Sequence, residues 1–276
     1  HGSGADHSGE PLMRMGVFGL GEAGSRIAAD LAQSSIQVSA YDPADVCTPD
    51  GVVRCDSPVG AIQDAAVVIA LTAATDAMEA LDQAFDDIPA GAIYADFSTA
   101  SASLKIDLAA RAFQRHIAFV DIALLAVVPG NGLRTTALAS GTGADRFVDI
   151  FGSLGMPVES LGEKPGDAAT RKLLRSVFMK GLAGVMIEAL QAADRANLSS
   201  WLWSNLTSEI AKADESLVHR LVSGTGSHAE RRLHEMKASA QLLQDLGVEP
   251  VMTRGTVENL QRVLEDGLPP IPAAAS

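Results

Sequence analysis

The apolar positions of this chain follow two different periods, and the change between them divides it into two parts. Between residues 13 and 163, short apolar runs with the spacing of strands alternate with segments of helical spacing. From residue 164 to 268 the spacing is helical, and little strand-type alternation remains. Strands that alternate with helices are typical of a doubly wound sheet. The pattern therefore predicts a doubly wound α/β domain over 13–163 and an all-α domain over 164–268.

In the first part, apolar runs predict six strands. Continuous apolar runs such as 66–71 are typical of parallel strands that are buried on both faces. The predicted strands cover 15–20, 36–42, 51–55, 66–71, 92–97 and 117–122, and segments 135–140, 147–151 and 157–161 continue the α/β pattern. Helices are predicted after Gly24, over 72–85 with 72–75 as the cap, and over 104–113.

In the second part, apolar residues at helical spacing predict one long helix over 167–196. Ser199 or Ser200 is the candidate cap of the next helix. Glycines commonly end helices, and they are expected to do so here. Further helices are predicted over 210–221, 229–246 and 256–265, with Gly247 and Gly267 as stops.

Composition and charge narrow the classes of partner. The chain has 276 residues, of which 47% are hydrophobic, and a formal net charge of −13. An acidic surface repels nucleic acid and anionic membranes, so we expect neither as a partner. The two cysteines, Cys47 and Cys55, are 55 − 47 = 8 residues apart, which fits neither a zinc site nor a redox pair. Reduced cysteines, and the lack of an apolar run of about 18 residues, predict a cytoplasmic protein without a metal site.

The two ends of the chain are interpreted separately from the domains. Residues 1–12 are polar and lack the apolar stretch of a signal peptide, so we interpret them as an expression scar. The tail 269–276 is rich in proline and alanine and is expected to fray.

A glycine-rich turn follows the first predicted strand, with Gly19, Gly21 and Gly24 in a G-x-G-x-x-G pattern. The first glycine allows a sharp turn, the second lets a pyrophosphate approach the backbone, and the third lets the helix pack closely on the strand. Free N–H groups at the helix start then face the phosphates. The motif predicts a dinucleotide site made of Gly19, Leu20, Gly21, Glu22, Ala23 and Gly24.

The second predicted strand ends in Asp42, which lies 42 − 19 = 23 residues after the first glycine. This is near the spacing expected for a carboxylate that binds the ribose of NAD, so we predict NAD as the cofactor, with NADP as the alternative. Ligands of a doubly wound sheet bind outside the carboxyl ends of its strands. This rule adds segment 71–75, Ser98, Thr99 and the turn after Asp121 to the candidate site.

Two lysines, Lys172 and Lys180, lie on the long predicted helix near the place where the two domains would form a cleft. A partly buried lysine near other cations has a pKa that falls toward neutrality, and it can then take the proton of a hydroxyl as hydride leaves the carbon. Either lysine can instead lie on a solvated helix surface with its stem over apolar neighbours. The residues alone leave these alternatives open.

Four segments resemble, in order and spacing, the β-hydroxyacid dehydrogenase superfamily, which includes 3-hydroxyisobutyrate and 6-phosphogluconate dehydrogenases. They are residues 16–24, Asp96-Phe-Ser-Thr99, Asp121 with its glycine-bearing turn, and 166–172. The resemblance covers nearly the whole chain. It implies a Rossmann domain followed by a helical dimerising domain, and an NAD(P)-dependent dehydrogenase that acts on the hydroxyl of a small acid.

The resemblance also implies roles for single residues. Lys172 follows a Gly-x-Ala-Ala start and occupies the position of the family's general acid/base. Ser98 and Thr99 match hydroxyls near the nicotinamide and the substrate. Leu71 and Thr72 match the loop on the adenosine side of the cofactor.

Two places differ from the family pattern, and a third resembles a bacterial branch of dehydrogenases with unassigned substrates. Segment 123–132 stands where typical members carry a Ser-Gly-Gly substrate loop, and Ser176 stands where they carry asparagine. The third place is segment 228–236. There His228, Arg231, Arg232 and Glu235 would share a helix face and could bind a substrate carboxylate or phosphate, or form a charged outer surface.

Other functions remain as alternatives. An imine reductase uses the same scaffold but generally places another residue at the lysine position. A nucleotide-binding dimer without catalysis is the alternative outside enzymes. The helical domain, with Trp201, Trp203 and Leu206 among its apolar residues, is too small to bury its apolar faces alone, so we predict a homodimer.

Overall fold

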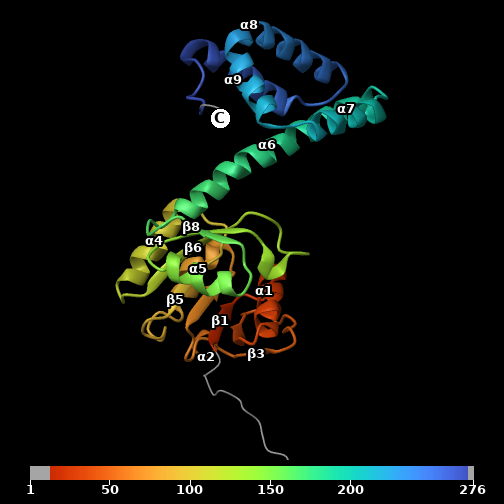
Figure 1. The fold of residues 1–276 in the computed structure, drawn as a ribbon. Coiled ribbons are helices and arrows are strands. Elements are labelled where there is room, and N and C mark those ends of the chain that lie inside the picture. Colours follow the sequence, from red (N-terminus) through yellow and green to blue (C-terminus); the bar gives the residue numbers. More distant parts are fainter. Residues whose placement is uncertain (1–12, 273–276) are drawn as a thin grey trace, which may run out of the picture. The chain divides into compact units, whose positions relative to one another are not determined.

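The computed structural model describes residues 13–272, which form two compact units (Figure 1). The first unit ends at Arg175 and the second begins at Ser176. The division thus falls inside the long helix and not at residue 163, because the first turns of that helix belong to the α/β unit. The predicted expression scar 1–12, and residues 273–276 of the predicted tail, lie outside the described residues.

An eight-stranded sheet forms the centre of the first unit among the described residues, in the order β3-β2-β1-β4-β5-β6-β7-β8. Its strands are β1 (Arg14–Phe18), β2 (Gln37–Tyr41), β3 (Val52–Arg54), β4 (Val67–Ala70), β5 (Ile93–Asp96), β6 (Ala118–Leu124), β7 (Ala137–Ser140) and β8 (Val158–Ser160). Within these strands, the neighbours are parallel except for β6 and β7, which run antiparallel. The six predicted strands are all present, and the doubly wound prediction is confirmed.

Helices pack on both faces of this sheet (Figure 1). Helices α1 (Glu22–Gln33) and α5 (Ala144–Ser153) cover one face, and α2 (Pro58–Ala61), α3 (Ala77–Asp82) and α4 (Ala102–Phe113) cover the other. Side chains alternate along each strand, so that Val17 belongs to one buried apolar cluster and Phe18 to the other. Because both faces are apolar, the strands appear in the sequence as continuous apolar runs.

The predicted helix over 72–85 is wrong in part. The structure has a short 3-10 helix, η1 (Ala74–Asp76), followed by α3, which ends at Asp82. Neither start is capped by a side chain, so 72–75 does not act as the predicted cap. Thr72 instead lines a pocket at the end of β4. A second 3-10 helix, η2 (Gly132–Arg134), follows β6.

The long helix predicted over 167–196 is confirmed as α6 (Asp167–Arg195), and α7 (Ser199–Ala211), α8 (Glu215–Asp245) and α9 (Val251–Asp266) follow it. The helix predicted over 210–221 is wrong, because Asp214 ends that stretch and caps α8 by accepting a hydrogen bond from the Leu217 amide at 3.0 Å. The predicted serine cap of α7 is also wrong, since Leu198 occupies the cap position. Gly247 and Gly267 follow the ends of α8 and α9, as predicted.

Glu188 links α6 to the start of α9 within the second unit. Its carboxylate accepts hydrogen bonds from the Met252 amide at 2.7 Å, the Thr253 amide at 2.9 Å and the Thr253 hydroxyl at 2.6 Å. Burial alone would raise the pKa of Glu188, but these hydrogen bonds outweigh it and hold the pKa below its usual value. The charged form therefore serves as a cap for α9, whose first amides lack intrahelical acceptors.

None of the helices described between residues 13 and 272 has the length and apolar content that a membrane crossing requires.

Candidate functional site

A pocket of about 390 Å³ lies at the carboxyl ends of β1, β2 and β4, where the strand order reverses direction. Gly19 follows β1, Asp42 follows β2, and Leu71 and Thr72 follow β4, and all four line the pocket. Such switch points are the usual nucleotide-binding positions of doubly wound sheets. The structure thus brings together residues that the sequence analysis assigned to the dinucleotide site.

The three motif glycines differ in what surrounds them. Gly19 has φ of +90°, and a Cβ on it would lie 2.5 Å from the Leu71 carbonyl oxygen. A Cβ on Gly24 would lie 2.0 Å from the Gly19 carbonyl oxygen, so the start of α1 packs directly on the turn. A Cβ on Gly21 would meet nothing within 4 Å, and this residue lines the pocket. Two glycines are thus required by the fold, and the third leaves room for a ligand.

The start of α1 carries amides suited to an anion. Its cap residue is Gly21, which has no side chain that could accept from the amides of the first turn. That turn contains Glu22, Ala23 and Gly24. Uncapped amides at a helix start, together with the helix dipole, attract phosphate groups. Leu20 is buried and uses its own amide to donate to Asp42 Oδ2 at 2.6 Å.

Asp42 is held in place by the backbone on both sides. Besides the Leu20 amide on Oδ2, the Ala44 amide donates to Oδ1 at 2.8 Å. Each carboxylate oxygen has a further lone pair, which can accept a hydrogen bond from a ribose hydroxyl in the pocket. The neighbouring cation, Arg54, donates to the carbonyl oxygens of Asp42, Ala44 and Val46 at 2.6, 2.7 and 3.3 Å.

The hydroxyl of Thr72 gives an independent sign of a missing polar partner. Its Oγ1 is buried, and among the described residues it has no hydrogen-bond partner. Buried polar groups are nearly always hydrogen-bonded in native proteins. Thr72 lines the same pocket as Gly21 and Asp42. An open glycine, an anchored carboxylate and a buried hydroxyl without a partner fit a dinucleotide.

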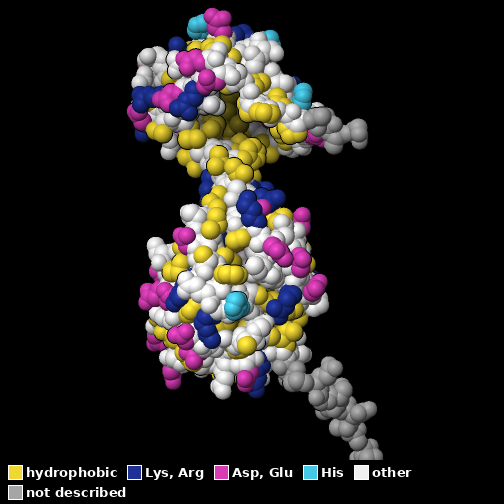
Figure 2. All heavy atoms as spheres, turned by 90° about the vertical axis from the view of Figure 1, so that its left-hand side faces the viewer, with side chains coloured by type: hydrophobic (Ala, Val, Ile, Leu, Met, Phe, Trp, Pro, Cys, Tyr) yellow, Lys and Arg dark blue, Asp and Glu magenta, His cyan; other side chains and the backbone are white. Residues whose placement is uncertain are grey.

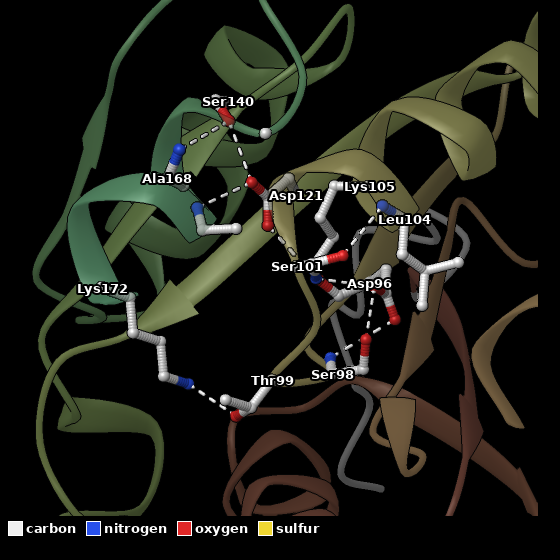
Figure 3. Close-up of polar contacts among 12 residues, drawn as sticks. Asp96, Ser98, Thr99, Ser101, Leu104, Lys105, Asp121, Ser140, Ala168 and Lys172 are labelled. Atoms are coloured by element: carbon white, nitrogen blue, oxygen red, sulfur yellow. Dashed lines mark hydrogen bonds and ion pairs between the residues drawn. The ribbon is translucent and has the colours of Figure 1, made fainter. Parts of the chain in front are cut away.

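A second group of polar side chains lies at the end of β5 and the start of α6, as Figure 3 shows. Lys172, on the second turn of α6, donates from Nζ to Thr99 Oγ1 at 2.8 Å. Ser98 is buried, and its hydroxyl donates to Asp96 Oδ2 at 2.7 Å. The structure thus joins Lys172 to the Ser98-Thr99 turn across 73 residues of sequence. The assigned roles of these three residues toward cofactor and substrate stay predictions.

Asp121 is fully buried and takes part in an ion cluster that the sequence analysis missed. Lys105 on α4, which is 1% exposed, lies 2.6 Å from Asp96 Oδ2 and 3.1 Å from Asp121 Oδ1. Contact between Asp121 and a substrate stays a prediction, and in this structure its carboxylate faces the protein interior. One signal could have identified Lys105, since it shares the buried face of α4 with Leu108 and Ala112 at helical spacing.

The other predicted substrate residues belong to the second unit. Ser176 lies one turn after Lys172 on α6. His228 has φ of −131° and ψ of 23°, which interrupts the helical backbone of α8. Arg231 pairs with Glu235 at 3.1 Å on the exposed surface. Arg232 donates to the Leu221 carbonyl oxygen at 3.2 Å and to the Thr225 hydroxyl, across this kink. Their substrate contacts stay predictions.

The fold and the pocket define a nucleotide-binding protein of the Rossmann class, and the comparisons with known families agree. Residues 14–147 match the family model described as the NAD binding domain of 6-phosphogluconate dehydrogenase. Residues 193–263 match a domain of unknown function, DUF1932. The amino-terminal unit is therefore an NAD(P)-binding domain of the kind found in 6-phosphogluconate dehydrogenase, which agrees with the resemblance that the sequence motifs indicated.

Individual relatives extend this picture. A curated relative is the "uncharacterized 28.5 kDa protein in 7S RNA 5′ region" of Methanothermus fervidus, with 28% identity over 148 residues, which are 54% of this chain and 57% of that protein. The chain thus spans little more than half of that relative. A solved conserved hypothetical protein from Sinorhizobium meliloti is 26% identical, with a TM-score of 0.60 over 94% of this chain and 92% of that one.

Reductases with the same fold are more distant in sequence. A reductive aminase from Aspergillus terreus in complex with NADPH4 has a TM-score of 0.77 at 16% identity, over 93% of this chain and 95% of that one. An imine reductase from Myxococcus stipitatus in complex with NAD+ has a TM-score of 0.78 at 14% identity, over 94% and 96% of the two chains. Identities this low establish the shared fold alone.

The different surroundings of Gly21 and Gly24 lead to a testable contrast. Gly21→Val should leave the melting temperature near that of the wild type, because its side chain enters open space, and should weaken NAD(P)H binding at least about tenfold, or 1.4 kcal/mol. Gly24→Ala should lower the free energy of unfolding by about 1–3 kcal/mol, because its Cβ overlaps the backbone. Thermal melts and NAD(P)H fluorescence titrations measure both effects. Unchanged cofactor affinity in Gly21→Val would contradict the assigned phosphate position.

Proposed function

We propose that the protein is an NAD(P)-dependent oxidoreductase that oxidises the hydroxyl of a β-hydroxyacid-like small acid, or catalyses the reverse reduction, with Lys172 as the general acid/base. The observation that carries this proposal is the 2.8 Å contact between Lys172 Nζ and Thr99 Oγ1. It brings an amine to the carboxyl end of β5, two strands from the start of the dinucleotide turn in the order β1-β4-β5.

The chemistry requires a proton acceptor beside the substrate. When the C–H bond of an alcohol gives its hydride to a nicotinamide, the hydroxyl proton must leave in concert, or a high-energy protonated carbonyl forms. In its neutral form, Lys172 can accept that proton at Nζ, and it returns the proton to the carbonyl oxygen in the reverse direction. Thr99 orients the amine, because its hydroxyl oxygen accepts one of the N–H bonds.

The substrate residues of this proposal are given for each unit by itself. Ser98 and Thr99 would contact the substrate from the turn after β5, and Ser176 from the same helix as Lys172. Arg231 would bind an acidic group after it exchanges its exposed partner Glu235, a pair of small energetic value. His228 and Arg232 would act from the kink of α8.

A second candidate function is the reduction of imines. It is favoured by the whole-chain likeness to imine reductases and reductive aminases, with TM-scores of 0.74 to 0.78 for structures that include one from Pseudomonas sp.. Those proteins act, by their names, on carbon–nitrogen bonds. A panel of β-hydroxyacids and cyclic imines, each with NAD(H) and NADP(H), separates the two activities. Cofactor binding without turnover of any compound would support the non-catalytic dimer.

The test of the catalytic assignment is Lys172→Met. This change keeps much of the side-chain volume and removes the group that transfers the proton, so turnover should fall by about 10²–10⁴-fold while NAD(P)H affinity is unchanged. Steady-state kinetics on the best substrate of the panel and fluorescence titration measure the two quantities. Lys180→Met is the matched control, since Lys180 is exposed on the same helix, and it should retain near-normal turnover. Normal turnover in Lys172→Met would refute the assignment.

We also infer a preference for NAD(H) over NADP(H). The carboxylate of Asp42 would repel a 2′-phosphate, and Arg54, the nearby cation, is engaged with backbone carbonyl oxygens. Asp42→Ser should lower the ratio of NADH to NADPH affinity at least about tenfold, or 1.4 kcal/mol. The ratio is informative because any loosening of the turn affects both cofactors alike. Asp45→Ser, an exposed change in the same loop, is the control, and tighter NADPH binding in the wild type would contradict the inference.

A homodimer is the assembly we propose. Large apolar side chains are exposed along α6 and α7 in the single chain, including Val177 at 74%, Phe178 at 63% and Trp201 at 62%. Figure 2 shows hydrophobic side chains along α6, and exposed patches of this kind mark interaction surfaces. Light scattering at micromolar concentration should give twice the mass of 28.6 kDa, and Phe178→Glu should shift it toward the monomer. A monomeric wild type would refute the proposal.

A further inference from the structure

Two buried carboxylates lie side by side on neighbouring strands, one at the end of β5 and the other in the middle of β6. Asp96 ends β5, Asp121 lies in β6, and the two are register partners in the parallel pair. Both are fully buried. Two carboxylates so close in a medium of low polarity repel each other strongly unless a cation or hydrogen-bond donors compensate them. The arrangement therefore depends on the groups that surround it.

Lys105 supplies the cation from α4. Its Nζ donates to Asp96 Oδ2 at 2.6 Å and to the Asp96 carbonyl oxygen at 2.9 Å, and forms an ion pair with Asp121 Oδ1 at 3.1 Å. Two of the donors of this ammonium group are hydrogen-bonded to Asp96, whereas Asp121 Oδ1 is held by the ion pair and has no hydrogen-bond partner among the described residues. With 1% of its side chain exposed, Lys105 has no role on the surface and cannot reach a substrate.

The second negative charge is compensated by the start of α6. Asp121 Oδ2 accepts hydrogen bonds from the Ala169 amide at 2.9 Å and from the Ser140 hydroxyl at 3.3 Å, and Ser140 Oγ accepts one from the Ala168 amide at 3.0 Å. The first amides of a helix lack intrahelical acceptors and carry the positive end of its dipole. The carboxylate thus fixes the position from which α6 begins.

A close backbone contact supports the same placement. Gly166, just before α6, lies so near the start of α4 that a Cβ on it would be 3.0 Å from the Ala102 carbonyl oxygen. The beginnings of α4 and α6 are therefore packed together. Lys105 of α4 and the amides at the start of α6 both contact Asp121.

The contacts form a closed ring, which Figure 3 displays. From Thr99 the chain leads to Ser98, whose hydroxyl and amide donate to Asp96 at 2.7 and 3.3 Å. Asp96 binds Lys105, Lys105 pairs with Asp121, and Asp121 accepts from the start of α6. Lys172, one turn further along α6, donates back to Thr99.

We propose that Lys105 is a positioning residue that holds the Ser98-Thr99 turn and the start of α6 in one geometry, and thereby sets the Lys172–Thr99 pair for proton transfer. The predicted effect of Lys105 on proton transfer rests on the proposed role of Lys172. Its effect on the position of the Ser98-Thr99 turn and of the start of α6 does not. Without the ammonium, the repulsion between the two carboxylates is relieved by protonation of one of them or by movement of the strands, and in both cases the ionic contact between the Ser98-Thr99 turn and the start of α6 is lost.

The primary test is hydrogen exchange in the full chain with Lys105→Met. The amides of Ala168 and Ala169 depend for protection on Ser140 and Asp121, so segment 166–172 should exchange faster, and segment 97–101 with it, while β1 and β4 keep their protection. Arg111→Met is the matched control, since it removes an ion pair of the same helix, to Asp82 at 2.7 Å, outside the ring. Wild-type exchange at 166–172, or faster exchange throughout the unit, would overturn the proposal.

A rescue variant separates charge from packing. In Lys105→Met/Asp96→Asn, one carboxylate remains, and the asparagine amide can donate to Asp121 and accept from Ser98. Protection of segment 166–172 should be largely restored, which a merely space-filling role of Lys105 does not predict, and failure to restore it would count against the proposal. If Lys105→Met does not fold, Ser140→Ala serves instead, and it should release the Ala168 amide alone, with unchanged exchange there as the contrary result.

Turnover provides the functional readout. Lys105→Met should lower kcat by about 10²-fold, the effect of misplacing a reacting group by about 1 Å, with an unchanged dissociation constant for NAD(P)H. Normal kcat alongside faster exchange at 166–172 would refute the catalytic part of the proposal. Normal turnover in Lys172→Met would contradict the proposed function and not the positioning role of Lys105. The two can be distinguished because the exchange experiment needs no substrate.

Discussion

The amino-terminal unit is governed by one constraint, which is that both faces of its sheet are apolar. Val17 and Phe18, adjacent in β1, belong to separate buried clusters under different helices. A strand of this kind has no position for a polar side chain except near its ends. The polar residues of interest, from Asp42 to Thr72 and Thr99, accordingly lie where strands finish. The nucleotide pocket and the Lys172 contact are thus consequences of how the core is built.

The buried ion cluster is the exception to this rule, and its energetics explain why it must be complete. Removing one partner of a buried pair leaves an uncompensated charge, which typically destabilises a protein by about 3–5 kcal/mol. Asp96, Lys105 and Asp121 compensate one another together with the amides at the start of α6. Each member is therefore useful only with the others in place. Such a cluster is better suited to define one geometry than to add stability.

The second unit follows different rules from the first. Local residues mark helix ends here, with Asp214 at the start of α8 and glycines after α8 and α9. The start of α9 is the exception, because the carboxylate of Glu188 caps it from a distance in sequence. Its apolar side chains on α6 and α7 are largely exposed in the single chain. The unit thus combines well-defined helices with an exposed apolar face, and such a face is the feature on which the proposed homodimer rests.

The sequence by itself determined most of the elements and the nucleotide motif, because their signals lie within a few residues of one another. The glycine spacing, Asp42 at a strand end, six strands and the long helix α6 all follow from such local patterns, and the structure contains them. The resemblance to a family selected Lys172, and local pattern did not.

Only the tertiary structure decided which distant residues meet. The contact of Lys172 with Thr99, the antiparallel pairing of β6 with β7, and the insertion of Lys105 between Asp96 and Asp121 join segments that no local period relates. The kink at His228 lies just before the helix predicted over 229–246, but the contact across it, from Arg232 to the Leu221 carbonyl oxygen, was not predicted. The physical reason is that local propensity acts over one or two turns, whereas charge compensation in a core depends on where the packed elements bring side chains together.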